Sequence, residues 1–365
     1  MVIKNKIILV AGGGTGGHLF PAISIGEKLE ENGLKVYYIG SKYGIEKDFY
    51  IKNKFKYFLL NIRGIQRGKN ISTLLKNISF PINFIISYIQ TIILIIKYKP
   101  KAIIGTGGYC SGVPLIAGIN FKIPTFIQDQ NSVPGLITKT LHKKINKIFI
   151  GFESLKKINT KKCIYTGNPI RKELILKNKA QSKIKLNFDR NKKLIFIVGG
   201  SQGARPINMH IYNNISFYIK NDYQIIWQSG VNDYEFLSTK IKNDSIVIKK
   251  FIKDISIPYS AADIVISRAG ALAISELTFM GKAMILIPFP QAAENHQFVN
   301  AENIKSKNAC KVIQQKNLIN NKLELCITQL FKSENAIKTL EQQSKLLAKP
   351  KAAEFIVNEI MKYIK

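Results

Sequence analysis

The sequence predicts an α/β protein made of two Rossmann-like, doubly wound parallel-sheet domains that face a cleft. Three glycine-dense turns carry this prediction because each follows a short apolar run: Gly12–His18, Gly105–Gly112 and Gly199–Arg205. Such runs are typical of buried parallel strands, and the glycines behind them let the backbone turn sharply and approach a ligand. A helix that starts at the turn directs N–H groups and its positive dipole end to the same place.

Composition supports two globular domains. A chain of 365 residues suits two α/β units, and a hydrophobic fraction of 46% supplies the core that a disordered chain lacks. The four cysteines are scattered without a Cys-x-x-Cys pair, which predicts a reducing cytoplasm. No basic and apolar leader pattern opens the chain, so no secretory signal is expected.

The net charge of +32 is of the kind that attracts nucleic acid or anionic membranes. However, the lysines are spread along the whole chain, which is also rich in Ile and Asn, a combination typical of A/T-biased codon usage. We interpret the charge mainly as a solvated coat of that origin. Since no aromatic and basic motif accompanies it, nucleic acid is not an expected partner.

In the first half, strand-like and helix-like segments alternate, as in a doubly wound sheet. A helix through Ser24–Asn32 ends at Gly33, the residue type expected after a helix C-terminus. The predicted strands of this half are Ile7–Ala11, Val36–Ile39, Ala102–Ile104, Thr125–Ile127 and Lys147–Ile150.

The second half repeats this pattern. Its predicted strands are Leu194–Val198, Gln224–Gln228, Ile246–Ile248, Ile264–Ser267 and Ala283–Ile287. The lysine-rich stretch around Lys172–Lys193 separates the halves, and Gly167–Pro169 is the expected hinge. We predict an N-terminal domain of residues 1–168, joined by a C-terminal helix of residues 350–365, and a C-terminal domain of residues 169–349.

Asn77–Ile96 carries no charge in twenty residues, which is long enough to span a bilayer. A span here would place the strands at Ile7 and Ala102 on opposite sides of a membrane, although both are predicted in one sheet. We therefore expect Ile85–Ile96 to be a helix buried under the sheet.

The stretch before it has an apolar helical face flanked by cations, among them Arg67, Lys69 and Lys76. Two interpretations stay open: a helix that lies in a membrane surface, or an ordinary helix that faces the core. The candidate membrane-contact residues are Ile71, Leu74, Leu75, Ile78 and Phe80.

The first turn contains Gly-x-Gly-x-x-Gly after a strand, which is formally a dinucleotide fingerprint. That fingerprint also needs an acidic residue at the end of the second strand to bind ribose, but Val36–Ile39 is followed by Gly40-Ser41-Lys42. An NAD-dependent oxidoreductase is therefore disfavoured. The chain also has no Gly-x-x-x-x-Gly-Lys-Ser/Thr motif, which disfavours a P-loop ATPase.

His18 ends the first turn and is expected to face the cleft. A histidine, with an ordinary pKa of about 6.5, can act there as a base; alternatively, it only bonds a neighbouring loop. His142 and His210 are expected at the surface of helices. No histidine pair has metal-ligand spacing and no Asp-x-Asp triplet occurs, so we predict no metal and no other cofactor.

The segment Ser267–Glu276 follows a predicted strand and starts a helix at Gly270. Glu276 lies about two turns into this helix, where its carboxylate can bind a vicinal diol such as ribose. The same turn and Ser201 would then meet a diphosphate. The alternative is that Glu276 only caps the helix or forms a salt bridge.

Seven motifs, in order and over nearly the whole chain, resemble those of the MurG family of bacterial peptidoglycan N-acetylglucosaminyltransferases. They are Gly13–His18, Gly107–Gly112, Gln130-Asn131, Gly167–Arg171, Gly199–Arg205, Ser267–Glu276 and Pro288–Gln297. The resemblance implies the GT-B fold, with an acceptor- and membrane-facing first domain and a UDP-GlcNAc-binding second domain.

The resemblance further implies inverting transfer of GlcNAc from UDP-GlcNAc to the C4 hydroxyl of MurNAc in lipid I, which gives lipid II for cell-wall synthesis. It implies a peripheral enzyme on the cytoplasmic face of the inner membrane, with cell-wall synthesis and division proteins as candidate partners. A soluble UDP-GlcNAc 2-epimerase, which shares the architecture and the donor, is the alternative.

The resemblance also implies residue roles. Those near the donor sugar are Thr15, Gly16, Gly17, Asn131 and Gln297; those at the diphosphate are Arg171 and Ser201. Those around the uracil and ribose are Ile252, Ala271, Leu272, Ala273, Ile274, Ser275 and Glu276. The chain departs from the family at Gln128-Asp129, where the family often has His-Glu, and at Ala273, where it often has Thr.

Inversion at an anomeric carbon needs a base for the acceptor proton and a stabiliser for the departing diphosphate. We predict His18 as the base, with Asp129 as the second candidate if its pKa is raised. The leaving-group charge would fall to backbone N–H groups of the turns, the helix start at Ala271, Ser201 and Arg171.

Overall fold

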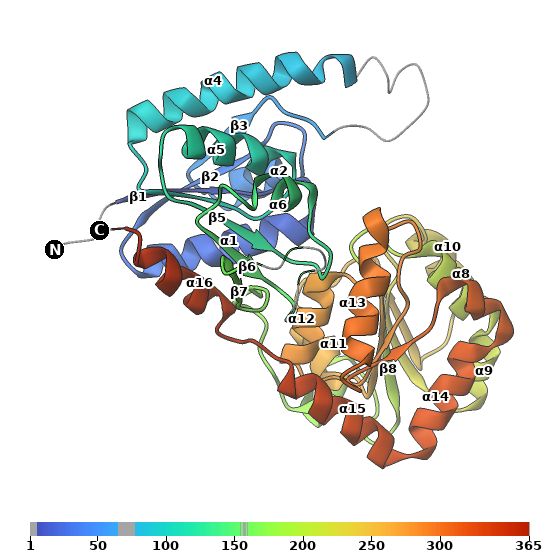
Figure 1. Ribbon diagram of the computed structural model, residues 1–365. Helices are drawn as coiled ribbons and strands as arrows, with labels where there is room; N and C mark the ends of the chain where they lie inside the picture. The colour runs from blue at the N-terminus through green and yellow to red at the C-terminus, as the bar shows by residue number, and fades with distance from the viewer. Residues whose placement is uncertain (1–5, 65–76, 154, 156–157, 159, 365) are drawn as a thin grey trace. The chain divides into compact units, whose positions relative to one another are not determined.

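The computed structural model describes residues 6–64, 77–153, 155, 158 and 160–364. They form two compact units (Figure 1): one runs up to Arg171 and resumes at Pro350, and the other comprises Lys172–Lys349. The boundary therefore follows Arg171, whereas the sequence analysis placed it after residue 168. The reason lies in Ile170 and Arg171, which contact Ser24 and Phe20 of the first unit.

The sheet of the first unit has seven parallel strands in the order β3-β2-β1-β4-β5-β6-β7. Their bounds are β1 Ile7–Ala11, β2 Lys35–Ser41, β3 Tyr57–Leu60, β4 Ala102–Gly105, β5 Thr125–Asp129, β6 Lys147–Ile150 and β7 Cys163–Tyr165. The central strand β1 pairs with β2 and β4, so that Ile8 lies beside both Val36 and Ala102. The predicted strands of this half are confirmed, and β3 and β7 are additional edge strands.

Helices cover both faces of this sheet. They are α1 Gly16–Glu31, α2 Glu46–Lys52, α4 Phe80–Tyr98, α5 Tyr109–Asn120, α6 Leu136–Leu141 and α16 Ala352–Met361. On one face, α1 and α16 share a core with Ile8 and Val10, so the chain's last helix packs on its first. On the other face, Leu9 and Ile103 pack beneath α5, and α4 lies outside α5 (Figure 1).

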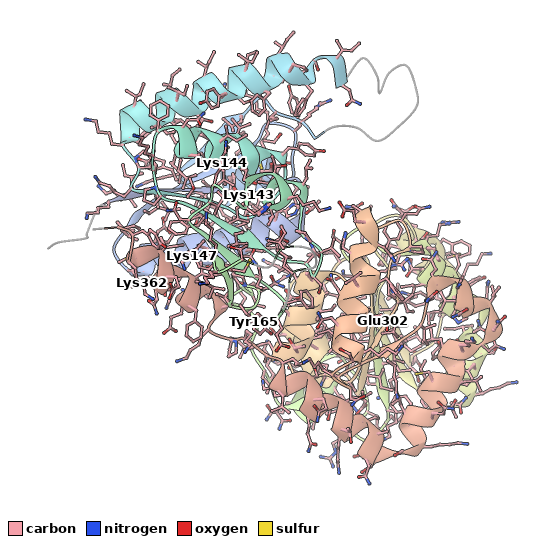
Figure 2. The ribbon with its side chains drawn as sticks, viewed as in Figure 1. Lys143, Lys144, Lys147, Tyr165, Glu302 and Lys362 are labelled. Atoms are coloured by element: carbon pink, nitrogen blue, oxygen red, sulfur yellow. The ribbon has the colours of Figure 1, made fainter. Side chains whose placement is uncertain are left out.

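The expectation that Ile85–Ile96 is buried under the sheet is wrong. Helix α4 buries only a narrow stripe of four residues against its neighbours: Ser87, Thr91, Leu94 and Ile95. Its opposite face exposes six isoleucines at helical spacing, each between 40% and 62% accessible: Ile82, Ile85, Ile86, Ile89, Ile93 and Ile96. Figure 2 shows a row of side chains that project from α4 away from α5. Leu94 and Ile95 join the core on this face of the sheet, but α4 packs largely on α5, so the rest of the helix stays outside the core.

The sheet of the second unit has six parallel strands in the order β10-β9-β8-β11-β12-β13. Their bounds are β8 Leu194–Val198, β9 Gln224–Gln228, β10 Ile246–Lys249, β11 Ile264–Ser267, β12 Met284–Leu286 and β13 Lys311–Val312. The five predicted strands are confirmed, and the edge strand β13 is additional. Trp227, the chain's single tryptophan, is fully buried on β9.

The α-helices of the second unit surround this sheet. They are α7 Lys179–Lys185, α8 Arg205–Asn213, α9 Ile215–Lys220, α10 Tyr234–Lys240, α11 Ser256–Ala261, α12 Ala271–Phe279, α13 His296–Lys305, α14 Lys322–Lys332 and α15 Glu334–Leu346. Side chains of α8, α14 and α15 form one core with β8, β9 and β11. The two doubly wound parallel sheets that the sequence predicts are therefore both present.

The basic side chains are spread over the molecule. Figure 2 shows Lys143, Lys144 and Lys147 after α6 and on β6, and Lys362 after α16. All four belong to the first unit.

Candidate active site

Each sheet has one place where the strand order reverses. It lies between β1 and β4 in the first unit and between β8 and β11 in the second. In doubly wound sheets, ligands bind outside the carboxyl ends of the strands at this point. Glycine-containing turns follow all four of these strands, so each unit places two of them at its own expected binding point.

In the first unit, these turns border a pocket of about 560 Å³. Its lining includes His18, Tyr43, Arg63, Tyr109 and Cys110 together with the first glycine turn. The guanidinium of Arg63 lies 3.9 Å from the centre of the Tyr43 ring. The pocket thus combines an imidazole, a cation and two phenols next to the start of α1.

His18 lies against the glycines of the turn after β4. A side chain on Gly107 would place its Cβ 2.5 Å from Cδ2 of His18, so this close approach requires glycine. Nδ1 of His18 is 3.2 Å from the carbonyl oxygen of Gly13 and 3.3 Å from Oγ1 of Thr15. A carbonyl oxygen only accepts hydrogen bonds, so the bond to Gly13 places the ring proton on Nδ1 and the basic lone pair on Nε2.

Asp129, the second base candidate, is buried, and its carboxylate accepts hydrogen bonds from the segment that follows β5. Its Oδ2 accepts hydrogen bonds from the Gly135 N–H at 2.9 Å and the Thr138 hydroxyl at 2.5 Å. Its Oδ1 is 3.4 Å from the Asn131 N–H. These bonds fix the segment that holds Asn131 and starts α6. The geometry therefore favours His18 over Asp129 as the base.

Gln128, one of the departures from the family pattern, has a structural role. Its amide donates to Oδ1 of Asn168 at 2.9 Å, and the Asn168 amide donates to the Gln130 carbonyl at 3.1 Å. All three side chains are buried. An amide at position 128 thus joins the end of β5 to the segment after β7.

Three of the predicted donor contacts belong to the start of α1, where Thr15 is the N-cap and Gly16 and Gly17 begin the helix. Arg171 ends the first unit, with its guanidinium 5.0 Å from the centre of the Phe20 ring on the same helix. The Ser24 hydroxyl holds this segment by donating to the Ile170 carbonyl at 3.1 Å. The described structure therefore brings Arg171 close to α1.

In the second unit, the turn Gly199–Ala204 leaves Ser201 exposed before α8 begins at Arg205. Gln228, at the end of β9, secures this turn: its Nε2 donates to the Gly200 carbonyl at 3.1 Å. Its Oε1 accepts the N–H of Ile252 at 2.9 Å. One neutral amide thus sets the positions of both the glycine turn and Ile252.

The turn after β11 starts α12, which carries the run Ala271–Glu276. Gly270 caps this helix, and no acidic residue lies in its first turn, so the helix start keeps its positive end. Glu276 is buried, with its Oε2 3.4 Å from the Tyr259 hydroxyl. The Ser275 hydroxyl donates to the Ala271 carbonyl at 2.9 Å, so it serves the helix itself.

Arg268 and Gln297 organise the loop after β12. Arg268 donates to the carbonyls of Ile287 and Pro288 at 3.1 and 3.2 Å and to Gln315 at 2.7 Å. Burial lowers the pKa of its guanidinium to about 10. Oε1 of Gln297 accepts the Phe289 N–H at 3.0 Å, which closes the loop onto α13.

Two features differ from the sequence expectations. His210 is not a surface residue: its Nε2 lies 2.9 Å from Oε1 of Glu324, and both side chains are less than 10% exposed. Of the predicted membrane residues, Ile71, Leu74 and Leu75 lie outside the described residues, Ile78 is 63% exposed, and Phe80 turns inward against Tyr109. Within the described part of the chain, no group of three His, Cys, Asp or Glu residues is placed to hold a metal ion.

Sequence reasoning missed Glu46 and Gln228, both of which contact a glycine turn. The Glu46 carboxylate accepts hydrogen bonds from the backbone N–H groups of Gly14 and Ser41, each at 2.8 Å. The only local signal in the sequence was the missing acid at the end of β2. In the structure, the Glu46 carboxylate reaches that strand end from α2.

Comparisons with known proteins agree with this architecture. Residues 8–150 match the glycosyltransferase family 28 N-terminal domain, and residues 194–356 match the glycosyltransferase family 28 C-terminal domain. In solved structures, MurG of Acinetobacter baumannii superposes with a TM-score of 0.77 at 23% identity, covering 98% of this chain and 99% of that one. A UDP-N-acetylglucosamine 2-epimerase superposes less closely, with a TM-score of 0.65 at 12% identity, covering 99% and 96%.

The two units thus define a GT-B protein. A curated relative from Flavobacterium psychrophilum is 38% identical over 99% of this chain and 98% of its own length. It is named UDP-N-acetylglucosamine–N-acetylmuramyl-(pentapeptide) pyrophosphoryl-undecaprenol N-acetylglucosamine transferase. The chain belongs to glycosyltransferase family 28.

Proposed function

We propose that this chain transfers GlcNAc from UDP-GlcNAc to the C4 hydroxyl of MurNAc in lipid I, with inversion, and so forms lipid II. The observation that carries the proposal concerns the two places where the strand order reverses. Their side chains suit different parts of the reaction. The first holds a histidine whose bond to the Gly13 carbonyl directs its lone pair to Nε2. The second holds a glycine turn, a helix start and the Glu276 carboxylate.

The acceptor step needs a base. Nε2 of His18 takes the proton of the acceptor hydroxyl as that oxygen attacks the anomeric carbon of GlcNAc. The imidazolium that forms keeps its Nδ1–H bond to the Gly13 carbonyl. Proton transfer of this kind typically contributes about 10²–10⁴-fold to a rate.

The donor binds at the second unit in this proposal. The start of α12 and Ser201 bind the diphosphate, Ile252 packs beside the uracil, and the Glu276 carboxylate binds the ribose hydroxyls. Gln297, together with Thr15, Gly16, Gly17 and Asn131 of the first unit, contacts the sugar. Backbone N–H groups, Ser201 and Arg171 stabilise the departing diphosphate without a metal ion.

The acceptor is a lipid, so the enzyme must work at a membrane surface. Helix α4 supports this requirement, because it is the one helix in the described residues that is long and apolar enough to span a bilayer. It cannot span while the sheet is intact, since β3 before it and β4 after it lie in the same sheet. We propose that α4 lies in the cytoplasmic surface of the inner membrane, with the isoleucine face inserted and Lys97 and Lys99 beside the headgroups. Partners from cell-wall synthesis and division stay predictions.

The reaction is tested with radiolabelled UDP-GlcNAc and a short-chain lipid I analogue, with and without EDTA. We expect product in both conditions, a loss mainly of kcat in His18→Ala, and a raised KM for the donor in Glu276→Ala. His142→Ala is the matched control and should behave as wild type. Strict metal dependence, or an unchanged kcat in His18→Ala, would contradict the assigned roles. Conversion of UDP-GlcNAc to a C2 epimer without an acceptor would support the epimerase instead.

Membrane binding is tested by flotation with anionic vesicles. We expect the triple change of Ile82, Ile85 and Ile89 to Ser to reduce the bound fraction, because each removes exposed apolar surface that inserts into lipid. Ile319→Ser, which removes an 85% exposed isoleucine from the second unit, is the control. Equal flotation of wild type and the triple variant would rule out α4 as the contact surface.

A further inference from the structure

Glu46 is an acid that the proposed reaction does not yet use. It is the first residue of α2 and is fully buried. Its Oε1 accepts the N–H of Ser41 and its Oε2 accepts the N–H of Gly14, both at 2.8 Å. Acceptance at both oxygens is the bonding pattern of an ionised carboxylate.

Three glycines surround this carboxylate. A Cβ on Gly13, Gly40 or Gly44 would lie 2.3, 2.5 or 2.1 Å from an atom of the Glu46 side chain. None of these positions tolerates a larger residue while Glu46 stays in place. The local sequence is therefore built around a buried acid at the end of β2, directly beneath the first glycine turn.

One peptide group connects Glu46 to His18. The N–H of Gly14 and the carbonyl of Gly13 belong to the same peptide group, and they point to different partners. The N–H donates to Glu46 at 2.8 Å, while the carbonyl oxygen accepts from Nδ1 of His18 at 3.2 Å. The carbonyl is also closely covered, since a Cβ on Gly108 would lie 2.4 Å from it.

We propose that Glu46 is a positioning residue that acts on His18 through the Gly13–Gly14 peptide group. Hydrogen bonds in series polarise one another, so the carboxylate bound at the N–H makes the carbonyl a stronger acceptor for Nδ1–H. This keeps the ring proton on Nδ1 and the lone pair on Nε2, and it holds the ring in place as the imidazolium forms. The arrangement follows the logic of a carboxylate and histidine pair, with a peptide inserted between them.

The inference rests on the proposed role of His18 as the base. It differs from a purely structural role for Glu46, which would fasten the loop but leave the histidine tautomer unchanged. Other ionisable groups that line the same pocket are Tyr43, Arg63, Tyr109 and Cys110. The test therefore compares variants in which all four of these are kept.

The central variant is Glu46→Gln, which keeps the size of the side chain but presents an NH₂ group to one of the two N–H donors. Its matched control is Asp48→Asn, which removes an exposed acid from the first turn of the same helix. The first measurement is the ¹⁵N spectrum of labelled histidine at alkaline pH, with the His18 signal assigned by its loss in His18→Ala. We expect Nδ1–H in wild type and in Asp48→Asn, and a mixture of tautomers in Glu46→Gln.

The second measurement is steady-state kinetics. We expect Glu46→Gln to lower kcat about ten- to a hundredfold with both KM values within about twofold, a smaller loss than the roughly 10⁴-fold that follows removal of a carboxylate bonded directly to a catalytic histidine. If Glu46→Gln does not fold, Glu46→Asp takes its place: it keeps the charge but draws it back by one methylene, and we expect an intermediate tautomer mixture.

An unchanged His18 tautomer in the folded variant would overturn the inference, whatever the activity. A tautomer change in Glu46→Gln together with full kcat in His18→Ala would instead support the coupling and remove His18 from the base role. The two proposals therefore fail in distinguishable ways.

Discussion

The two units carry a buried acid at opposite edges of otherwise similar sheets. In the first unit, Glu46 lies at the carboxyl edge, where it bonds the glycine turn after β1. In the second, Asp263 lies at the amino edge, just before β11, where it accepts the N–H of Leu194 at 2.7 Å and pairs with Lys183 at 3.0 Å and with Lys179. The carboxylate of Glu46 thus bonds a glycine turn directly, whereas the carboxylate of Asp263 stabilises the opposite edge of its sheet.

This difference predicts which unit binds phosphate. Two like charges about 4 Å apart repel each other by about 4 kcal/mol at an effective dielectric constant of 20. Glu46 therefore opposes a phosphate at the first turn but supports a histidine that becomes positive. At the second turn, the neutral amide of Gln228 bonds the loop itself, and the buried Asp233 is paired with Arg205 at 2.7 Å. We infer that the first unit accepts the proton of the acceptor hydroxyl and that the second unit binds the diphosphate of the donor.

The largest expected effect comes from replacing a glycine in the turn after β8. Gly203 has a φ of +82°, and a Cβ there would lie 2.0 Å from the Ser229 carbonyl oxygen. Gly203→Ala therefore combines backbone strain with a clash, and we expect it to lower the free energy of unfolding of this unit by about 5 kcal/mol. Gly200→Ala is the control: its φ is +98° but its Cβ would meet open space, so only strain of about 1–2 kcal/mol remains.

Urea titration followed by tryptophan fluorescence measures both variants. Trp227 is the chain's single tryptophan and is buried in the second unit, so the signal reports that unit. Equal losses in the two variants would mean that the contact between Gly203 and Ser229 does not define the turn.

The next effect tests the acid at the amino edge. Although burial raises the pKa of Asp263, the ion pair with Lys179, the Leu194 N–H and Lys183 together lower it below its usual value. Asp263→Asn leaves Lys183 buried without its charge partner, and we expect a loss of about 3 kcal/mol at pH 7. Since the folded-state pKa is depressed, the stabilisation is fully present above the unfolded pKa of about 3.9 and is lost as pH falls through the folded value.

The difference between wild type and Asp263→Asn should therefore shrink between pH 5 and pH 2, as the same fluorescence titration measures. Asp254→Asn removes a more exposed acid bonded to Lys177 at 2.6 Å, and it should cost less than about 1 kcal/mol. A difference for Asp263→Asn that stays constant with pH would show that the carboxylate charge is not what stabilises the unit.

The comparison also shows what the sequence can and cannot predict. The central strands were predictable because an apolar run followed by glycines is a local pattern. The exposed face of α4 was not, because its composition is that of a buried helix and only the position of α5 decides which face is covered. The burial of His210 depends on Glu324, which is 114 residues away.

In each unit, the sequence predicted one part of the candidate site and missed another. His18 and Ser201 belong to glycine-dense segments that follow a strand, and each stands next to a glycine in the sequence. Glu46 could not be predicted in this way, because it bonds backbone N–H groups, and every residue except proline has one. Gln228 ends β9 but bonds backbone on two other segments, so its role too comes only from the folded chain.

The smallest expected effect decides where the diphosphate binds. Ser201 is exposed on the second turn, and loss of one hydrogen bond of about 0.5–1.5 kcal/mol corresponds to about two- to tenfold weaker UDP binding in Ser201→Ala. Glu46→Gln should change UDP affinity by less than about twofold, because its carboxylate serves the first turn. Isothermal titration with UDP measures both, and Asp48→Asn controls for a simple change in net charge. Tighter UDP binding in Glu46→Gln with no effect of Ser201→Ala would place the phosphates at the first turn and reverse the division of roles between the two units.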